Sequence, residues 1–546
     1  MRSTFMGLEA SKKGLFVQQS ALYTTGHNIS NANTDGYSRQ RVNMAATSGY
    51  PHAGLNSPTY PGHLGTGVEA TSVQRIRDEF IDRQYRQETN KLGYWESTLN
   101  SINQMEDILS EPSEFGINQS FNDFWKALED ISTNPEDTAA RKVALAKAEA
   151  LADAFNYNYT QLETIQGNIG NEISVTTTEI NSLLKQIAAI NAQVQAVEPN
   201  GYVTNDLYDA RDLLVDKLNE LIPVSIERVP SGGNASSVAE GSLTVYFKPA
   251  NSNEAIILVH GDEHAEISVN DQNGQITAAE PHDSFAGMQI SWMDATPPTA
   301  NDLAKLTTPN AASPTGATYE YGAFETSKGK LLALIDSYGY TDAQGNIKGT
   351  YPEMLANLDK LATTFMNAFN TMHKNGFTLG TAAVPSANGG DLFGGTGAKD
   401  LQVLISDPKL LAASSGAGEE GNGKWAIELA NLQFLGMNGQ PSTILGNTIN
   451  FSANSDLDGA TFQSFYKGII GDLAVAGQEA ARLEYNSGTL LLTIENNRAS
   501  MSSVSLDEEM TNMITFQQAY NANARMITVV DETLDKIING MGRVGL

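Results

Sequence analysis

The sequence has no cysteine among its 546 residues. Disulfide bonds, thiolate metal sites and a cysteine nucleophile are therefore excluded. Long hydrophobic runs are missing as well. The longest apolar run near the start is Leu15-Phe16-Val17, which is too short for the core of a signal peptide, and no run approaches the length of a membrane span. We therefore expect no cleaved signal peptide and no membrane-spanning segment.

Basic residues are scarce, with 34 Lys and Arg against 63 Asp and Glu, which gives a formal net charge of −29. A nucleic-acid-binding protein would carry a basic stripe, so the composition argues against that class of partner. Hydrophobic residues make up 40% of the chain and charged residues 18%, as in ordered globular proteins. At roughly 150 residues per domain, the length predicts about three or four domains.

The last forty residues predict one long helix that needs a partner. Acidic residues at 507–509 suit its start, and Gly540 and Gly542 suit its end. Apolar and small side chains recur at steps of mostly three or four residues, at Leu506, Met510, Met513, Tyr520, Ala524, Ile527, Val530, Leu534 and Ile537. Such spacing places them along one side of a helix, close to a heptad pattern, so a second helix is expected to cover them.

The N-terminus offers that second helix. Leu8, Leu15, Leu22 and Ile29 recur every seven residues, and the turn-forming cluster at 33–36 predicts where the helix has ended. The second half of this segment is rich in Thr, Asn and Gly, which have low helix propensity. An alternative is therefore that the helix stops near Tyr23 and the rest is loop.

The charges of the two ends are complementary. Residues 1–50 hold five basic and two acidic side chains, whereas residues 501–546 hold three basic and six acidic ones. We therefore predict a two-helix coiled coil made by the two chain ends, with the rest of the chain inserted between them. So few Leu and Ile side chains cannot offset the entropy of ordering two helices. We expect the ends to be mobile in a free monomer and to become ordered against other subunits.

The chain between the ends changes its periodicity twice. Residues 37–90 are predicted to be extended and rich in turns, with a tight turn at Gly65-Thr66-Gly67 rather than a phosphate loop. Residues 94–221 show helical stripes, interrupted at Pro135. After the turn cluster at 230–234 the period becomes that of strands. Helical spacing returns at 331–335, 355–369 and 473–494, while 377–455 is predicted to form loops, short helices and a few strands.

These segments predict a mainly α fold with a β insert. Its parts are a terminal two-helix coiled coil, a domain of long bundled helices and a small inserted β domain. The expected domains are 1–60 with 500–546 for the coiled coil, 61–230 with 320–499 for the helical domain, and 231–319 for the β insert.

The sequence shows little sign of catalytic chemistry. The only dense group of possible metal ligands is His260-Gly261-Asp262-Glu263-His264. It follows a strand and contains glycine, so it predicts a hairpin turn rather than the helical arrangement of a zinc protease. We find no nucleophile elbow, Walker loop or EF-hand loop. We predict no enzymatic activity, no cofactor and no metal, and we expect the four tryptophans to be core residues.

Two segments carry a family resemblance. The run from Asn28 to Arg39 (NISNANTDGYSR) resembles the signature that opens bacterial flagellar rod, hook and hook-associated proteins. The run 517–525 (QQAYNANAR) is similar to the closing helix of the same families. Within this group the chain is most similar to the family of first hook-associated proteins, through YSRQ at 37–40, FWKAL at 124–128, YDARDLL at 208–214 and FNTMHKNG at 369–376.

The resemblance implies a structural subunit that is exported unfolded by the flagellar type III system and assembles as a ring joining hook to filament. Its implied neighbours are the hook protein and the next hook-associated protein or filament, and its implied location is extracellular. It also implies a cytosolic export chaperone that holds the C-terminal helices. The expected assembly and coiled-coil interface is Leu8, Leu15, Leu22, Asn28, Ile29, Asn31, Asn33, Gly36, Tyr37 and Arg39 with Leu506, Met510, Met513, Tyr520, Ala524, Ile527, Leu534 and Ile537.

Two other functions stay open from the sequence. The first is another axial flagellar protein, such as the hook or distal rod subunit, which would share the terminal motifs. The second is a secreted enzyme or binding protein with its site in the 231–319 insert.

Overall fold

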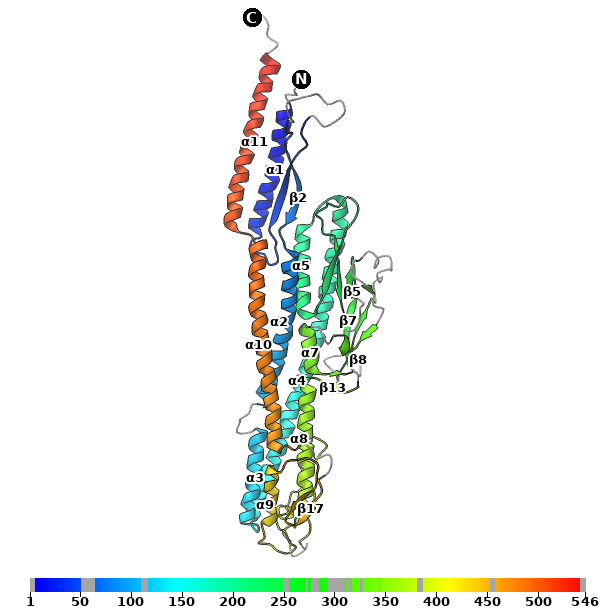
Figure 1. Ribbon diagram of the computed structural model, residues 1–546, viewed down its shortest axis with the longest axis vertical. Helices are drawn as coiled ribbons and strands as arrows, with labels where there is room; N and C mark the ends of the chain where they lie inside the picture. The colour runs from blue at the N-terminus through cyan, green and yellow to red at the C-terminus, as the bar shows by residue number, and fades with distance from the viewer. Residues whose placement is uncertain are drawn as a thin grey trace.

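The protein is an elongated molecule in which both chain ends lie at the same end (Figure 1). The structure is a computed structural model. It describes residues 5–50, 64–109, 116–248, 255–271, 274–275, 284–292, 306, 311–312, 317–324, 328–342, 344–380, 386–451 and 457–540.

The two chain ends form an antiparallel helix pair. Helix α1 spans Phe5–Ser30 and helix α11 spans Leu506–Gly540. Gly7 of α1 lies beside Val530 of α11, whereas Asn28 near the end of α1 bonds to Glu509 at the start of α11. The predicted pairing of the ends is therefore confirmed. The alternative that α1 stops near Tyr23 is wrong, because side-chain bonds of the polar second half hold the helix to Ser30.

A hairpin connects the helix pair to the rest of the molecule. Strand β1 (Gln40–Ala46) pairs antiparallel with β2 (Val68–Arg75), with a bulge after Asn43. Gly67, which precedes β2, has a φ of +115° and packs against the backbone of Ala10 in α1, so a side chain would be strained there. Residues 51–63, which contain all three prolines of the predicted extended region, lie outside the described residues.

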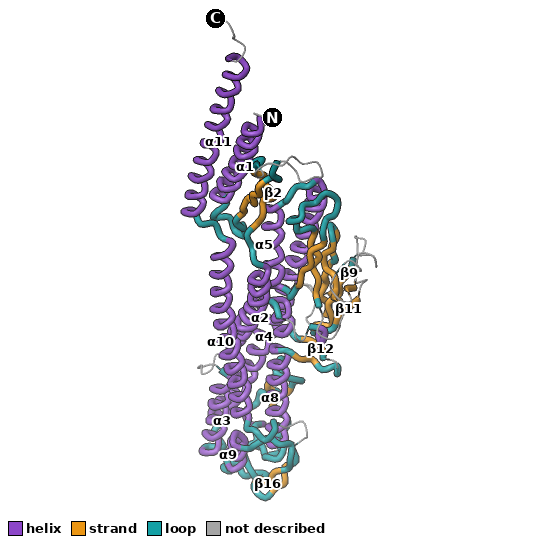
Figure 2. Tube along the Cα trace, turned by 45° about the horizontal axis from the view of Figure 1, so that its top comes forward, coloured by secondary structure: helices purple, strands orange, loops and turns teal. Residues whose placement is uncertain are grey.

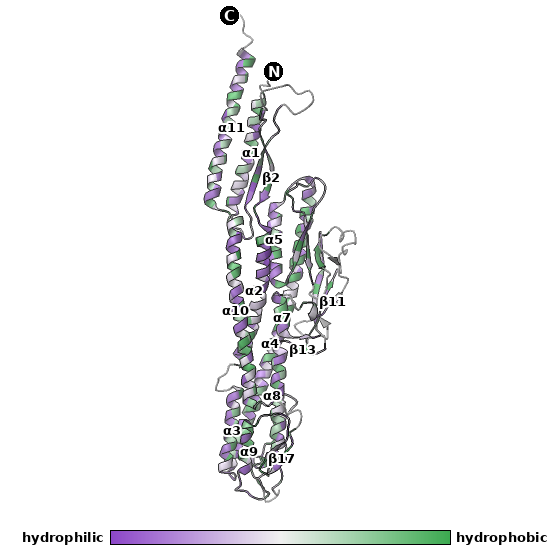
Figure 3. Cartoon of the chain, viewed as in Figure 1, coloured by the Kyte–Doolittle hydropathy of each residue, from purple (hydrophilic) through white to green (hydrophobic). Residues whose placement is uncertain are grey.

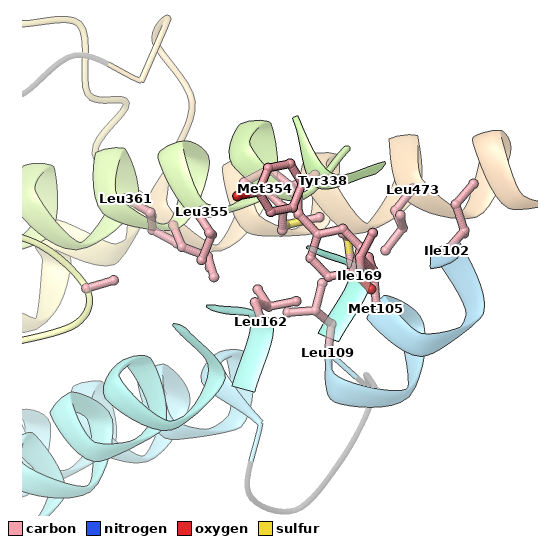
Figure 4. Close-up of a cluster of buried hydrophobic side chains, with 14 of the residues drawn as sticks. Ile102, Met105, Leu109, Leu162, Ile169, Tyr338, Met354, Leu355, Leu361 and Leu473 are labelled. Carbon is pink, nitrogen blue, oxygen red and sulfur yellow. The ribbon is translucent and has the colours of Figure 1, made fainter. Parts of the chain in front are cut away.

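Long helices form the body below the hairpin. They are α2 (Glu79–Leu109), α3 (Ile117–Thr133), α4 (Thr138–Val197), α5 (Asn205–Leu221), α7 (Lys330–Tyr338), α8 (Thr350–His373) and α10 (Phe462–Ser502). Figure 4 shows side chains from several of them, among them Ile102 of α2, Leu162 of α4 and Leu473 of α10, pointing toward one another. Farther from the termini, an aromatic cluster is almost fully buried. Phe121, Trp125 and Phe462 stack on one another in it, and Phe365 meets them edge-on.

The helical predictions for 94–221, 331–335, 355–369 and 473–494 are confirmed, as is the interruption at Pro135. The prediction that the chain stays extended to residue 90 is wrong, because α2 already begins at Glu79. The buried face of its first three turns carries Asp82, Arg86, Glu88, Thr89 and Asn90 rather than apolar side chains. Hydrophobic periodicity therefore gave no sign of this first part of the helix.

The β part packs against one side of the body, next to α4 (Figures 1 and 2). One sheet contains β3 (Ser225–Val229), β4 (Ser242–Phe247), β5 (Ala255–His260), β6 (Glu263–His264) and β10 (Ala311–Ala312). The other contains β7 (Glu266–Asp271), β8 (Gly274–Gln275), β9 (Phe285–Ser291), β11 (Ala317–Tyr319), β12 (Tyr340–Thr341) and β13 (Ile347–Lys348). Three of these strands, β3, β12 and β13, lie outside the predicted β insert at 231–319. The predicted domain boundaries stay a proposal.

The segment His260–His264 is the predicted hairpin turn. His260 pairs with Glu263 between β5 and β6, and Gly261 has a φ of +60°. The Nδ1 atom of His260 lies 3.0 Å from the hydroxyl of Thr244. The segment thus serves as a strand connection.

The end opposite the termini is rich in loops, as predicted for 377–455. It holds helix α9 (Lys424–Asn431) and the short hairpins β14 (Phe393–Gly394) with β15 (Gln402–Val403) and β16 (Ser442–Ile444) with β17 (Asn447–Ile449). Short 3-10 turns occur at η1 (Glu198–Asn200), η2 (Tyr321–Ala323), η3 (Pro408–Leu410) and η4 (Leu432–Phe434). Polar and apolar residues alternate along the long helices (Figure 3), and none of the described helices could cross a membrane.

Candidate assembly interface

Helix α11 contacts α1 through a regular heptad seam. Eight of its buried and half-buried positions recur in alternating steps of four and three residues, at Glu509, Met513, Phe516, Tyr520, Asn523, Ile527, Val530 and Leu534. Asn512, Ala519 and Ala524 are half-buried beside this row. This is the spacing of a coiled-coil seam. Met513, Tyr520, Ala524, Ile527 and Leu534 of the predicted interface are half-buried here. Leu506, Met510 and Ile537 are 48%, 52% and 42% exposed.

The closest contacts of α1 come from small residues. Gly14 packs so tightly that an added Cβ would lie 2.9 Å from Oδ1 of Asn523, and Ala21 is 1% exposed. The row Gly7, Gly14, Ala21 and Asn28 repeats every seven residues, each one position before a predicted residue. Leu8, Leu15, Leu22 and Ile29 therefore lie about 100° around the helix from this row, where they are half-buried. The equal spacing of the small residues was the available signal, which sequence reasoning missed.

Asn28 and Arg39 tie the base of the helix pair together, in what we call the Asn28–Arg39 clasp. Asn28 accepts from the backbone N–H of Gln40 at 3.0 Å and donates to its carbonyl at 2.9 Å. The side-chain amide thus makes the same pair of hydrogen bonds to β1 that a neighbouring strand would make. It also donates to Glu509 at 3.1 Å. Arg39 donates to Glu509 at 2.8 Å and, through its two terminal nitrogens, to Glu508 at 3.0 and 2.9 Å.

The clasp also fixes the break between α10 and α11. The backbone N–H of Arg39 donates to the carbonyl of Ser502 at the end of α10, at a distance of 2.9 Å. Glu509 is only 2% exposed, so its charge is compensated by Asn28 and Arg39 rather than by water. One arginine thus sets both where α10 ends and where α11 starts.

The other predicted motif residues lie around the clasp. Tyr37 donates to Oδ1 of Asn28 at 2.8 Å, and burial together with the nearby carboxylate of Asp206 raises the pKa of Tyr37. Asn31 donates to the carbonyl of His27 at 3.1 Å, whereas Asn33 is exposed. Gly36 has a φ of +78° and approaches Leu213 of α5, which explains why the turn needs glycine.

Below the clasp lies a buried charge network, which we call the Arg–Asp joint. It consists of Arg75, Arg77, Arg86 and Arg498 with Asp82, Asp209, Asp212 and Asp216, contributed by β2, the β2–α2 connection, α2, α5 and α10. Arg498 bridges Asp82 at 2.9 Å and Asp216 at 2.6 Å, which connects α10 to α2 and α5. The backbone N–H of Ser38 donates to Asp209 at 3.0 Å, which connects the joint to the clasp.

Asp212 is the centre of the joint. Its carboxylate lies 3.0 Å from Arg75, 3.0 Å from Arg77 and 3.5 Å from Arg86. Burial alone would raise the pKa of Asp212, but the three arginines outweigh it and hold that pKa well below its usual range. The carboxylate is therefore ionised at neutral pH. The signal in the sequence was the spacing of Asp209, Asp212 and Asp216, which lie on one face of α5.

Comparison with known proteins identifies the family. The family described as "Flagellar hook-associated protein FlgK helical domain" matches residues 102–393. Flagellar hook-associated protein 1 of Bacillus subtilis is 39% identical over 552 aligned residues that cover 99% of each chain. The chain belongs to the FlgK family of flagellar hook-associated proteins. Membership of this family makes it a structural component of the flagellum at the hook–filament junction.

Other matches agree with the FlgK assignment. Flagellar hook-associated protein 1 of Escherichia coli is 26% identical, over 96% of this chain and 98% of that one. The flagellar hook junction protein FlgK from Burkholderia pseudomallei shares the fold, with a TM-score of 0.57 at 13% identity, over 77% of this chain and all of that chain. Residues 496–540 match the family described as "Flagellar basal body rod FlgEFG protein C-terminal". The closing helix of this FlgK-family chain is thus related to that of rod proteins, as the sequence resemblance implied.

Possible metal ligands are scattered over the described part of this FlgK-family chain. Across the described residues no three His, Asp or Glu side chains are grouped so that they could hold a metal ion. His264 is half-buried in the hairpin turn, where burial lowers its pKa. The known relatives are structural proteins of the flagellum.

Proposed function

We propose that the protein assembles as a ring of identical subunits between the hook and the filament. The observation that carries this is the large amount of apolar surface left uncovered on the helix pair. Exposed apolar side chains along α1 and α11 are Phe5, Phe16, Tyr23, Leu506, Met510, Ile514, Met526, Val529, Ile537 and Ile538. Exposed apolar side chains gathered on two helices in this number indicate a contact site between proteins.

The Arg–Asp joint suits a subunit that must carry mechanical load. Buried pairs lock the relative orientation of β2, α2, α5 and α10, because moving one element would leave charges unpaired away from water. The joint therefore fixes the direction in which the helix pair leaves the body. We propose that this stiffness lets the ring transmit torque from the hook, and that the hook protein and the next hook-associated protein or filament are its axial neighbours.

We also propose that the protein is exported in an unfolded state and that a cytosolic chaperone binds it before export. A chain without cysteine forms no crosslink that would block passage through a narrow channel. The exposed apolar residues of α11 would promote aggregation in the cytosol, so a chaperone that covers the C-terminal helices is expected. The protein would then reach the outside without a cleaved signal peptide.

Another axial role, as a hook or rod subunit, is the second candidate because residues 496–540 match the rod family. That match covers only the C-terminal helix and the end of α10. The helical-domain match over 102–393 favours the junction role.

The test is deletion and complementation in the native host. Loss of the gene should leave hooks without filaments and release unpolymerised flagellin. The double variant Leu15→Asp with Leu22→Asp should be secreted but should fail to restore attached filaments, because two charges would enter the half-buried face of α1. The matched control is Tyr157→Asp with Val175→Asp on α4, where both side chains are about two-thirds exposed (64% and 67%), and it should restore filaments. Attached filaments in the deletion strain would contradict the proposed function.

A further inference from the structure

A groove opens between β1 and α11 on one side of the helix pair. Its floor is formed by Ala21 and Thr24 of α1, one wall by Arg41 of β1, and the other wall by Asn512 and Phe516 of α11. The groove has a volume of about 520 Å³. A cavity of about 150 Å³ holds a benzene molecule, so this groove has room for several side chains.

An apolar stripe lies on the opposite side of the same helix turns. Leu506, Met510 and Ile514 are spaced four residues apart and are 48%, 52% and 56% exposed. Residues two positions apart on a helix project about 200° apart. Met510 is two residues from the groove residues Glu508 and Asn512 in the sequence. Ile514 is two residues from the groove residues Asn512 and Phe516. The stripe therefore projects away from the groove at the same height along α11.

Each surface carries one charge without an ion-pair partner. Arg41 in the groove wall is exposed and makes no ion pair with any described residue. Asp507 is also exposed and has no ion-pair partner in the described part of the chain. Asp507 is seven residues from Ile514, so it lies on the same face as the stripe. The groove is also lined by Glu508 and Glu509, but both are paired with Arg39. Arg41 is thus the unpaired positive charge of the groove, and Asp507 is the unpaired negative charge of the stripe.

We propose that the stripe of one copy fills the groove of the next copy. Met510 and Ile514 would pack over Ala21 and Thr24 of the neighbour, and Asp507 would pair with its Arg41. Two different surfaces on opposite sides of one helix form a head-to-tail contact, which builds a ring or a helical array when it repeats. Methionine suits this role because its flexible side chain adapts to an irregular groove. This inference rests on the proposed ring and assigns its lateral contact.

Mixed single-cysteine variants test the contact, since the natural chain has no cysteine. Met510→Cys and Thr24→Cys are expressed together with tags of different size, so a mixed disulfide can form only between copies. We expect mixed dimers as the main oxidation product in isolated flagella. The matched control pairs Thr24→Cys with Ile538→Cys, which is 71% exposed at the far end of α11, and should give little mixed product. Equal yields from both pairs, or no mixed product from the first, would overturn the inference.

Charge reversal gives an independent test. Arg41→Asp or Asp507→Arg alone brings like charges together and should lower the yield of mixed dimer at least about tenfold. The two reversals combined should restore most of it. Failure of the combination to recover contradicts the pairing of Arg41 with Asp507. If the deletion strain shows that the protein is needed for filament attachment and yet no mixed dimer forms, the lateral contact is wrong while the proposed function stands.

Discussion

Removal of the central carboxylate of the Arg–Asp joint should weaken the body of the protein strongly. Asp212→Asn keeps the shape of the side chain but leaves Arg75, Arg77 and Arg86 without the charge that all three face. Asp212 is 2% exposed and Arg75 is 6% exposed, so water cannot replace the lost carboxylate.

The size of the effect follows from the burial. Removing one partner of a buried ion pair typically costs about 3–5 kcal/mol, because the remaining charge is left uncompensated. Asp209 and Asp216 stay in place and offset part of this cost, so we expect a loss near the lower end of that range. With an m-value of roughly 3 kcal/mol/M in urea, a loss of about 3 kcal/mol lowers the midpoint of unfolding by about 1 M.

Urea unfolding followed by far-ultraviolet circular dichroism measures this loss on the transition that removes most of the helical signal. The matched control is Asp153→Asn on α4, where the carboxylate is exposed. Its midpoint should stay within the small change expected for a surface substitution, about 0.5 kcal/mol or less. If Asp212→Asn shifts the midpoint no more than this control does, the joint does not stabilise the body and the reasoning is refuted.

The effect of Asp212→Asn on stability should also depend on pH in a defined direction. The pKa of Asp212 is lower in the folded protein than in the unfolded chain. Its contribution to stability is therefore complete above the unfolded value of about 3.9 and is lost only as the pH falls through the folded value. The difference between the parent protein and Asp212→Asn should persist from pH 5 to pH 8 and narrow only in strong acid.

Three further predictions concern other parts of the molecule. Burial lowers the pKa of His373 to about 4, and its neutral ring donates to the carbonyl of Gly390 at 2.7 Å and accepts from the N–H of Ala412 at 2.8 Å. As the pH falls, the unfolded chain therefore takes up a proton on His373 before the folded protein does. Stability should fall by up to about 3 kcal/mol between pH 6.5 and pH 4. The urea midpoint of His373→Gln should not fall in this way. In the assembled junction, where α1 is ordered, Asn28→Asp replaces the amide donor by a charge that faces Glu509, which should cost about 2 kcal/mol or more and speed amide exchange in α1, unlike Asn33→Asp at an exposed position. Amide exchange on the free monomer should show little protection of residues 5–30, and strong protection would refute the expectation that the ends become ordered only on assembly.

Hydrophobic periodicity predicted those parts of the fold in which apolar side chains meet. The stripes of α3, α4, α8 and α10 repeat every three or four residues and therefore appear in a single sequence. The first turns of α2 could not be recognised in this way, because their buried face is built from charged and polar side chains. Two of these, Arg86 and Asn90, bond to residues more than a hundred positions away. A local sequence pattern does not show which distant residues will be the partners.

The candidate interface, too, could be predicted from the sequence only in part. The pairing of the chain ends and the involvement of Asn28 and Arg39 could be predicted from the heptads, the charges and the family resemblance. The closely packed row of α1 could not be predicted from the leucines, since Gly14 and Ala21 allow a close approach that leucine would prevent. The groove beside β1 depends on where the hairpin lies against α1, which only the three-dimensional structure reveals.

The most direct measurement of the central claim is a disulfide between the two chain ends inside working flagella. Gly7→Cys and Val530→Cys introduce two cysteines where an added Cβ at position 7 would lie 3.9 Å from the side chain of Val530. We predict that oxidation of isolated hook–filament junctions closes this bond within single subunits, seen as a faster-migrating monomer, while filaments stay attached. Junctions whose subunits show no such bond under the same oxidation would contradict the pairing of the ends and the assembly built on it.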